Sequence, residues 1–124
     1  MEGKLVNLFQ AKLVEGSSGP RDAVSGTLGI FSYSGAGDPG DLCLFVPDSP
    51  ERLGSKAKLR PGPGVVEQDG SLLRFTVGET GASYAWELVD PIADKEEIRA
   101  FLDFAEKRDR IIRHLLKGAR LLGE

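Results

Sequence analysis

The residue types that most often carry out chemistry are scarce in this chain. It has one histidine, His114, and one cysteine, Cys43, among 124 residues. His114 has no second histidine or cysteine near it at the spacing of a metal site, and Cys43 lies in the apolar run LCLFV, which favours a buried, inert thiol. No nucleophile with a base, and no convincing pair of loop carboxylates, accompanies them. The sequence therefore predicts a protein that is not an enzyme and needs no metal or cofactor.

A second group that could bind a ligand is a row of cations. Lys56, Lys58 and Arg60 fall on one face of an expected strand over 53–60, whose other face is apolar or small. Such a face could attract a phosphate-bearing ligand or an acidic protein. The same pattern is typical of a solvated strand that protects a sheet edge. Both interpretations are open at this point.

The last third of the chain concentrates positive charge. Apolar residues recur there at three- and four-residue spacing. Cations complement the dipole at the C-terminal end of a helix, but residues 107–120 hold more of them than this effect requires, namely Lys107, Arg108, Arg110, Arg113, Lys117 and Arg120. Packing on the rest of the domain, or contact with a membrane surface, would also explain such a segment. We expect instead a helix that binds a protein partner or a second copy of the chain, through Arg108, Ile111, Ile112, Leu115 and Leu116.

Length and composition limit the class of protein. A chain of 124 residues with 40% apolar and 28% charged residues fits one globular domain with a single core. Its net charge of −3 is not the excess of positive charge that proteins binding duplex nucleic acid usually carry. The N-terminus lacks a basic region followed by an apolar stretch, no run is long enough to span a bilayer, and a lone cysteine cannot form an intrachain disulfide. These features predict a soluble cytoplasmic protein.

The elements that would position these residues are mostly strands. The chain has 16 glycines and frequent turn signals, and its central feature is a hairpin over 22–46, in which two apolar strands flank the loop SGAGDPGD. In the first strand, Leu5, Phe9, Ala11 and Leu13 are expected on one face. The third strand is a continuous apolar run, which predicts burial on both faces. The expected strands are 4–15, 23–33, 42–46, 53–60, 65–68, 71–77 and 83–89.

A helix is expected after the last strand. Asp94 is a suitable N-cap and Glu97 follows at the third position, a pattern close to a capping box. A helix over 95–122 would be about 42 Å long. A small barrel cannot cover that length, so we expect the helix to bend back near 107–109, to pack on another chain, or to project. The predicted fold is mainly β, a six- to seven-stranded antiparallel barrel (1–92) closed at one end by one long C-terminal α-helix (93–124) of the same domain.

The order of these parts resembles the PilZ family of small bacterial six-stranded barrels. The resemblance rests on the strand GIFSYS at 29–34, the GD that opens LCLFVP, the polar-faced LGSKAKLR, and ELVDPIADKEEIRAFLDF, which runs from the last strand into the helix. Many PilZ domains bind cyclic di-GMP through an RxxxR motif and a D/N-x-S-x-x-G motif. The resemblance makes Asp22, Ser25 and Gly29 the nearest equivalents of the second motif, although both spacings are one residue longer here.

The arginine motif of the PilZ family is absent, because only Lys4 and Arg21 precede the glycine-marked strand. Two guanidinium groups would be needed to chelate the guanine and phosphate groups. The resemblance therefore implies a degenerate member that acts by binding protein partners.

Two other functions fit the same residues. A pleckstrin-homology-like barrel would also have seven strands and a C-terminal helix. In such a protein an anionic lipid headgroup or a phosphopeptide would bind to the row Lys56, Lys58 and Arg60. In a functional PilZ effector, Arg21 would join the degenerate motif in binding cyclic di-GMP. The first expectation is a non-enzymatic interaction module of PilZ-like type. It would contact a protein partner, or another copy of the chain, through the barrel surface near residues 21–34 and through its C-terminal helix.

Overall fold

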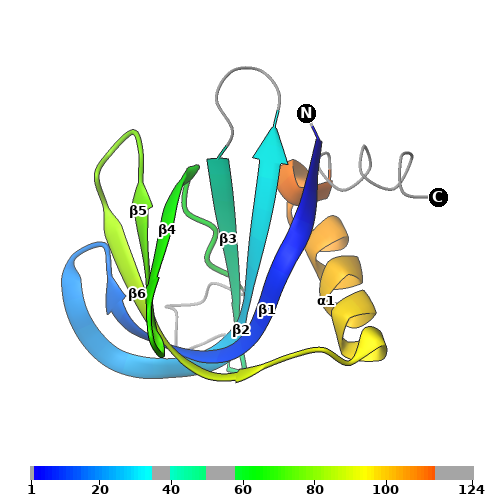
Figure 1. Ribbon diagram of the computed structural model, residues 1–124, viewed down its shortest axis with the longest axis horizontal. Helices are drawn as coiled ribbons and strands as arrows, with labels where there is room; N and C mark the ends of the chain where they lie inside the picture. Colours follow the sequence, from blue (N-terminus) through cyan, green and yellow to red (C-terminus); the bar gives the residue numbers. More distant parts are fainter. Residues whose placement is uncertain (1, 35–39, 50–57, 114–124) are drawn as a thin grey trace.

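The computed structural model describes residues 2–34, 40–49 and 58–113 (Figure 1). Within these residues the chain forms six strands followed by one helix. The elements are β1 (Glu2–Gly16), β2 (Gly19–Ser34), β3 (Gly40–Pro47), β4 (Gly64–Asp69), β5 (Leu72–Val77), β6 (Ser83–Pro91) and α1 (Lys95–Arg108). The mainly β fold and the antiparallel strands predicted from the sequence are confirmed.

The six strands form a ring in which each strand lies beside its neighbour in the sequence. β1 also pairs with β6, from Phe9–Pro91 to Glu15–Ala85, and this pairing joins the two ends of the sheet. β1 and β2 are the longest strands and sweep along the base of the ring, as Figure 1 shows. Between β3 and β4 only the pair Asp41–Gly64 is formed among the described residues, so this is the weakest join of the ring.

The interior of the ring is filled by side chains from every strand. The indole of Trp86 is fully buried there, and its ring centroid lies 6.0 Å from that of Phe45 and 6.1 Å from that of Tyr84. The buried members of this core are Ala11, Leu13, Val24, Leu28, Ile30, Cys43, Phe45, Leu73, Phe75, Val77 and Trp86. Val66 of β4 packs against them from the side.

The helix covers the outer face of the sheet, so the prediction that it closes one end of a barrel is wrong. α1 lies beside β1 and β2 in Figure 1, and Phe101 stacks on Phe31 of β2 with ring centroids 6.3 Å apart. This second core consists of Leu8, Phe31, Leu42, Leu44, Phe101, Ala105 and Ile112. The predicted burial of the third strand on both faces is confirmed, because Cys43 and Phe45 face the interior and Leu42 and Leu44 face the helix.

The predicted length of the helix is also wrong. α1 has 14 residues and ends at Arg108, where Asp109 adopts an extended conformation. Helical geometry resumes at 110–113, and this short segment returns Ile112 to the outer core. The expected bend near 107–109 is therefore present. The rest of the predicted helix lies outside the described residues.

Two further expectations need correction. Residues 53–57 of the predicted fourth strand lie outside the described residues, and Leu59 forms only an isolated bridge with Phe45. In β1, a register shift between Leu5 and Asn7 reverses the alternation of the side chains. Leu5 therefore packs in the outer core, whereas Phe9 packs against the interior one.

Candidate functional site

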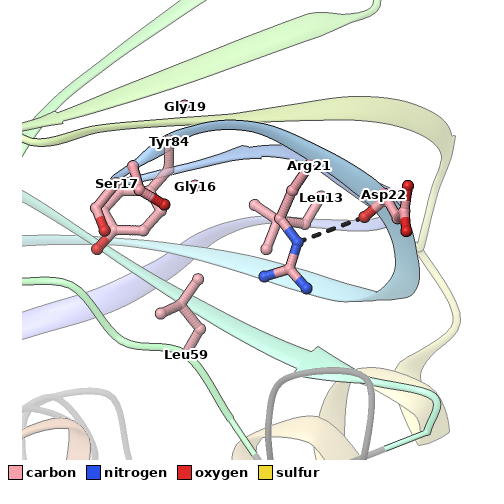
Figure 2. Close-up of a pocket in the computed structure, with 9 residues that line it drawn as sticks. Leu13, Gly16, Ser17, Gly19, Arg21, Asp22, Leu59 and Tyr84 are labelled. Atoms are coloured by element: carbon pink, nitrogen blue, oxygen red, sulfur yellow. Dashed lines mark hydrogen bonds between the residues drawn. The ribbon is translucent and has the colours of Figure 1, made fainter.

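The structure gathers polar and aromatic side chains around a hollow of about 460 Å³ at the rim of the ring (Figure 2). We call it the rim hollow. It is formed by the end of β1, the turn into β2, the start of β2, the segment before β4, and β6. Its lining residues are Leu13, Gly16, Ser17, Ser18, Gly19, Arg21, Asp22, Leu59 and Tyr84.

Local structure fixes the side chains that line the rim hollow. The turn between β1 and β2 is tight, because Gly16 pairs with Gly19 and only the two serines lie between them. The Arg21 side chain lies close to Gly16, where an added Cβ would be 3.7 Å from Arg21 Cδ, and its Nε donates a hydrogen bond of 3.4 Å to the backbone oxygen of Asp22. Tyr84 stacks on Trp86, with an interplanar angle of 24°. The hollow therefore combines one cation, one carboxylate, two serine hydroxyls and the phenol of Tyr84 with the apolar side chains of Leu13 and Leu59.

The residues singled out by the PilZ resemblance do not meet at one place. Arg21 and Asp22 line the rim hollow. Ser25 is exposed farther along β2, where its backbone oxygen accepts a hydrogen bond of 2.9 Å from Asp48. Gly29 lies beneath α1, and a Cβ added there would be only 2.6 Å from Phe101 Cζ. A ligand in the rim hollow would thus reach two of the four residues.

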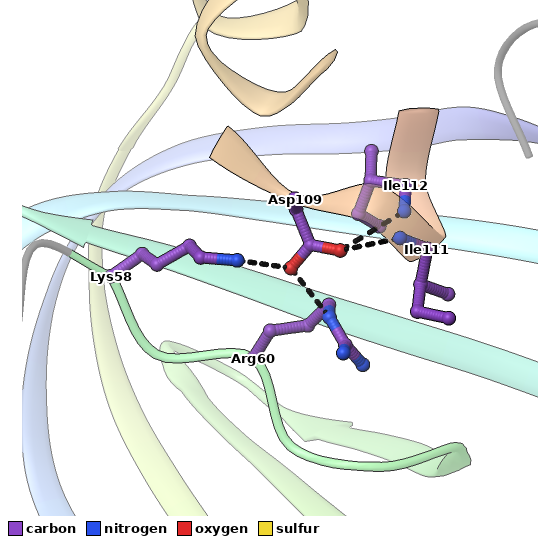
Figure 3. Close-up of polar contacts among 5 residues, drawn as sticks. All are labelled: Lys58, Arg60, Asp109, Ile111 and Ile112. Carbon is purple, nitrogen blue, oxygen red and sulfur yellow. Dashed lines mark hydrogen bonds and ion pairs between the residues drawn. The ribbon is translucent and has the colours of Figure 1, made fainter. Parts of the chain in front are cut away.

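The second set of candidates, the basic row, faces a buried carboxylate (Figure 3). Asp109 Oδ2 accepts hydrogen bonds from Lys58 Nζ at 2.6 Å and Arg60 Nε at 2.5 Å. Its other oxygen, Oδ1, accepts from the backbone N–H groups of Ile111 and Ile112 at 3.0 and 3.1 Å. We call this group the Asp109 cluster. Lys56, the third cation of the row, lies outside the described residues.

Electrostatics favour the ionised form of Asp109. Burial disfavours the charge, but the hydrogen bonds from Lys58 and from the Ile112 backbone, together with the charge of Arg60, outweigh burial and hold the pKa of Asp109 below its ordinary value. The side chain of Asp109 is 1% exposed, whereas those of Lys58 and Arg60 are 29% and 24% exposed. The carboxylate thus neutralises part of the basic row from within, and it also caps the helical segment that begins at Arg110.

The predicted partner-binding residues of the C-terminal helix are divided between core and surface. Ile112 is fully buried in the outer core. Arg108 is exposed, with its guanidinium carbon 5.7 Å from the centre of the Phe104 ring, and Ile111 is 43% exposed. Leu115 and Leu116 lie outside the described residues. Arg108 and Ile111 are therefore the members of this set whose side chains a partner could touch in the described part of the helix.

The helix and the sheet also enclose an apolar groove of about 300 Å³. It lies on the outer face, between α1 and the strands β1, β2 and β3. Its lining residues are Leu8, Gln10, Thr27, Val46, Ile92, Glu97, Ala100, Phe101 and Phe104. This groove offers a place for an apolar side chain, with one charged residue at its border.

In the described part of the chain, the residue types usually found in catalytic sites are not grouped as a metal site. No three histidine, cysteine, aspartate or glutamate side chains come together there as a metal site. Cys43 is fully buried in the interior core, and that burial, with the nearby charge of Asp41, raises the pKa of its thiol. A buried thiol with a raised pKa is a poor nucleophile. His114 lies outside the described residues.

Sequence reasoning missed most of the rim hollow. Ser17 and Ser18 fall between two expected strands and Tyr84 within a third, and nothing in their spacing indicates that β1, β2 and β6 meet there. Asp109 had a detectable signal, since it is the one acid among the cations of 107–120 and interrupts the apolar stripe. An aspartate at such an interruption is also a candidate N-cap for a second helical segment.

Comparison with known proteins gives no family for this chain, because no family model, no curated protein and no solved structure matches it. Among the described residues, no helix is both long enough and apolar enough to cross a membrane. The function must therefore be argued from the geometry of the chain itself.

Proposed function

We propose that this protein is a non-enzymatic interaction module, a degenerate relative of PilZ barrels, that binds a protein partner through the rim hollow. The observation that carries the proposal is the gathering of Arg21, Asp22 and Tyr84 with two serine hydroxyls in one concave place. Concave sites that combine apolar floor residues with a few polar groups are the usual form of binding sites. The interior of the ring is filled by its own side chains, so a ligand would bind at the surface.

A protein partner fits the rim hollow better than cyclic di-GMP does. A cyclic dinucleotide carries two phosphates and two guanines, and Arg21 is the single cation among the lining residues. The other residues of the degenerate motif lie elsewhere, with Gly29 under Phe101. An exposed loop that offers one carboxylate to Arg21 and one donor to Asp22 needs no second guanidinium.

The Asp109 cluster weakens the alternative in which the basic row binds a lipid headgroup or a phosphopeptide. Lys58 and Arg60 both direct a donor to the same buried carboxylate, at 2.6 and 2.5 Å. An anionic headgroup would have to compete with Asp109 for these donors. We therefore do not place the ligand of the protein at the basic row.

Site-specific photocrosslinking tests the proposed partner site. A photoreactive p-benzoylphenylalanine is placed at Ser18, in the rim hollow, and in a matched protein at Glu79, which is exposed in the turn between β5 and β6. In cells of the source organism, we expect a discrete protein adduct from Ser18 that Arg21→Glu abolishes and Arg21→Lys retains. The same adducts from both positions, or an adduct that survives Arg21→Glu, would contradict the proposal.

Thermal unfolding with cyclic di-GMP separates the proposal from the nucleotide alternative. A ligand at a hundred times its Kd stabilises a protein by about 2.7 kcal/mol, which is a shift of several degrees for a domain of this size. We expect no shift at micromolar nucleotide. A shift of several degrees that disappears in Arg21→Ala would replace the protein partner with cyclic di-GMP.

A further inference from the structure

The rim hollow presents a polar part and an apolar part to the same ligand. Its polar members are Ser17, Ser18, Arg21 and Asp22, and its apolar members are Leu13 and Leu59. In Figure 2 the terminal nitrogens of Arg21 point toward the side of the hollow on which Leu59 lies. A ligand in this place meets a cation and apolar side chains together. It must therefore carry an anionic group close to an apolar one.

The apolar part of the rim hollow is continuous with the interior core. Leu13 is 1% exposed and is a member of that core, and Leu59 packs against it. Leu59 is held in place by two backbone hydrogen bonds with Phe45, of 2.9 and 2.8 Å. An apolar side chain that binds here would extend the interior core, and removing its surface from water is favourable. The hollow therefore suits a ligand with an apolar side chain.

The polar part of the rim hollow suits a carboxylate. The hydrogen bond of 3.4 Å from Arg21 Nε to the backbone oxygen of Asp22 orients the guanidinium beside the turn. A guanidinium has five N–H donors and binds a carboxylate through two parallel hydrogen bonds. The Ser17 and Ser18 hydroxyls can donate further hydrogen bonds to the same group. A single carboxylate is thus the anion that matches one guanidinium and two hydroxyls.

The C-terminal residue of a protein combines these groups on one carbon atom. Its α-carboxylate, its side chain and its N–H all lie next to the same Cα, and the carboxylate of Asp22 is an acceptor for the N–H. An aspartate or glutamate inside a loop uses its own side chain as the anion, so a second residue must supply the apolar group. Capture of a terminal carboxylate is also one of the recurring modes of peptide recognition.

We propose that the rim hollow binds the C-terminal residue of the partner protein, and that this residue is apolar. Its carboxylate binds Arg21 and the serine hydroxyls, and its N–H donates to Asp22. Its side chain packs against Leu13 and Leu59. This inference rests on the proposed function, because it specifies which segment of the protein partner occupies the same hollow.

The N-terminus of a partner is a poorer occupant of the hollow. It carries an ammonium group, which only the carboxylate of Asp22 could neutralise. The guanidinium of Arg21 would then face a like charge, and like charges repel each other. A C-terminus instead uses the cation, the hydroxyls and the carboxylate of the hollow at once.

The photocrosslinking experiment at Ser18 identifies the partner segment when the adduct is digested and sequenced by mass spectrometry. We expect the cross-linked peptide to be the last peptide of the partner chain. An internal peptide would overturn this inference and leave the proposed function in place. The absence of an adduct that depends on Arg21 would contradict the proposed function itself.

A second experiment needs no cellular partner and uses the purified full-length protein. A library of random short peptides is displayed with free carboxyl ends, and the peptides that bind are sequenced. We expect an apolar residue at the last position of the selected peptides. The best peptide is then synthesised with a free carboxylate and, as its control, with a terminal amide, and binding is measured by fluorescence anisotropy. We expect amidation to weaken binding by about tenfold or more, because it removes the charge that Arg21 binds.

Matched variants show whether the rim hollow is responsible. Arg21→Glu should abolish binding of the free-carboxylate peptide. Arg99→Glu changes the net charge by the same amount at an exposed position of α1 and should leave binding unchanged. The thermal midpoints of the two variants show that both remain folded.

Four results would overturn the inference. They are a selection without preference at the last position, equal binding of the free-carboxylate and amide peptides, binding that survives Arg21→Glu, and competition by free leucine as strong as that by the peptide. The last result would assign the rim hollow to a free amino acid, which carries the same carboxylate and side chain but no partner chain.

Discussion

A carboxylate buried between two cations determines how the C-terminal end of the helix meets the sheet. Asp109 ends α1, caps the next helical segment through the N–H groups of Ile111 and Ile112, and binds Lys58 and Arg60 from another part of the chain. Each of these interactions needs an acceptor, and the two ion pairs also need a negative charge. Removing only the charge therefore separates the capping role from the electrostatic one.

We predict that Asp109→Asn lowers the free energy of unfolding by about 2 kcal/mol at neutral pH. The amide can still accept from the Ile111 and Ile112 N–H groups, but it leaves Lys58 and Arg60 without a counter-charge, and solvent access to both cations limits the loss. Urea unfolding measures the effect. The same substitution at the exposed Asp90 is the control and is expected to change stability by less than about 0.5 kcal/mol.

The effect of Asp109 should depend on pH in a defined direction. Because the folded-state pKa of Asp109 is lowered, its contribution is fully present above the unfolded value of about 3.9 and is lost as the pH falls from there through the folded pKa. The difference in unfolding free energy between wild type and Asp109→Asn should therefore shrink below about pH 4. A difference that stays constant down to pH 2 would mean that the charge of Asp109 contributes nothing.

At the scale of elements, most strands could be predicted because their signals are local. Alternation and turn residues placed the strand expected over 83–89 within two residues of β6 (Ser83–Pro91), and the Asp94 cap was correct, with Asp94 accepting from the Glu97 N–H at 3.0 Å. The position of the helix could not be predicted in this way. Its apolar stripe would fit the mouth of a barrel as well as its outer wall, and only long-range pairing decides between the two.

The contact at Gly29 explains why the helix packs on the outer face of the sheet. The Phe101 ring fills the space that a side chain at this position would need, so the absence of a Cβ lets the helix lie directly on β2. The sequence analysis related this glycine to a ligand motif through the PilZ resemblance. In the structure it has a packing role, at the contact between two elements.

We predict that Gly29→Ala destabilises the protein by about 1–3 kcal/mol, because the new methyl group would overlap the Phe101 ring. Gly62→Ala is the matched control, since a Cβ there would meet Val77 Cγ1 at an ordinary 3.5 Å. The smaller side chain of Phe101→Leu should restore part of the loss when combined with Gly29→Ala. Thermal unfolding of the four variants measures this coupling, and strictly additive effects would contradict the proposed contact.

For the whole molecule, the described part of the C-terminal segment belongs to the domain and does not project from it. Ile112 completes the outer core, and Asp109 connects the helix to the segment before β4. We predict that a chain ending at Lys107 is less stable than the full chain by about 3 kcal/mol or more, because it loses both features. A chain ending at Arg113 keeps both and should unfold at nearly the same urea concentration as the full chain.

The truncation after Arg113 also tests association through the C-terminal residues. If Leu115 and Leu116 bind a second copy, the full chain should sediment with a larger mass than the chain ending at Arg113. If both chains sediment as monomers, association through these residues fails as a hypothesis. The chain ending at Arg113 is expected to stay folded, so a change in its mass would report the loss of an interface and not unfolding.

The candidate site was harder to predict than the fold, because it depends on which strands meet. The PilZ resemblance indicates Arg21 and Asp22, but Tyr84 is more than sixty residues away and reaches the rim hollow through the pairing of β1 with β6. Hydrophobic alternation indicates that a strand exists and which face is buried. It does not indicate which strand will pair with it. The rim hollow lies where paired strands end, so its position depends on that pairing.

Because the ring is closed, a reagent in solution can reach the interior core only when the strands separate. Cys43 is fully buried on β3, next to the weakest join, and its side chain belongs to a core shared by strands on both sides of that join. Separating β3 from β4 would therefore expose Trp86, Phe75 and their neighbours as well as the thiol.

We predict that Cys43 reacts with a thiol reagent only through global unfolding, so that the free energy from the labelling rate equals that from urea unfolding. Both are measured at one pH, together with Asp109→Asn, which should lower the two values equally. A labelling free energy clearly below the global value would instead place a local opening at the join between β3 and β4.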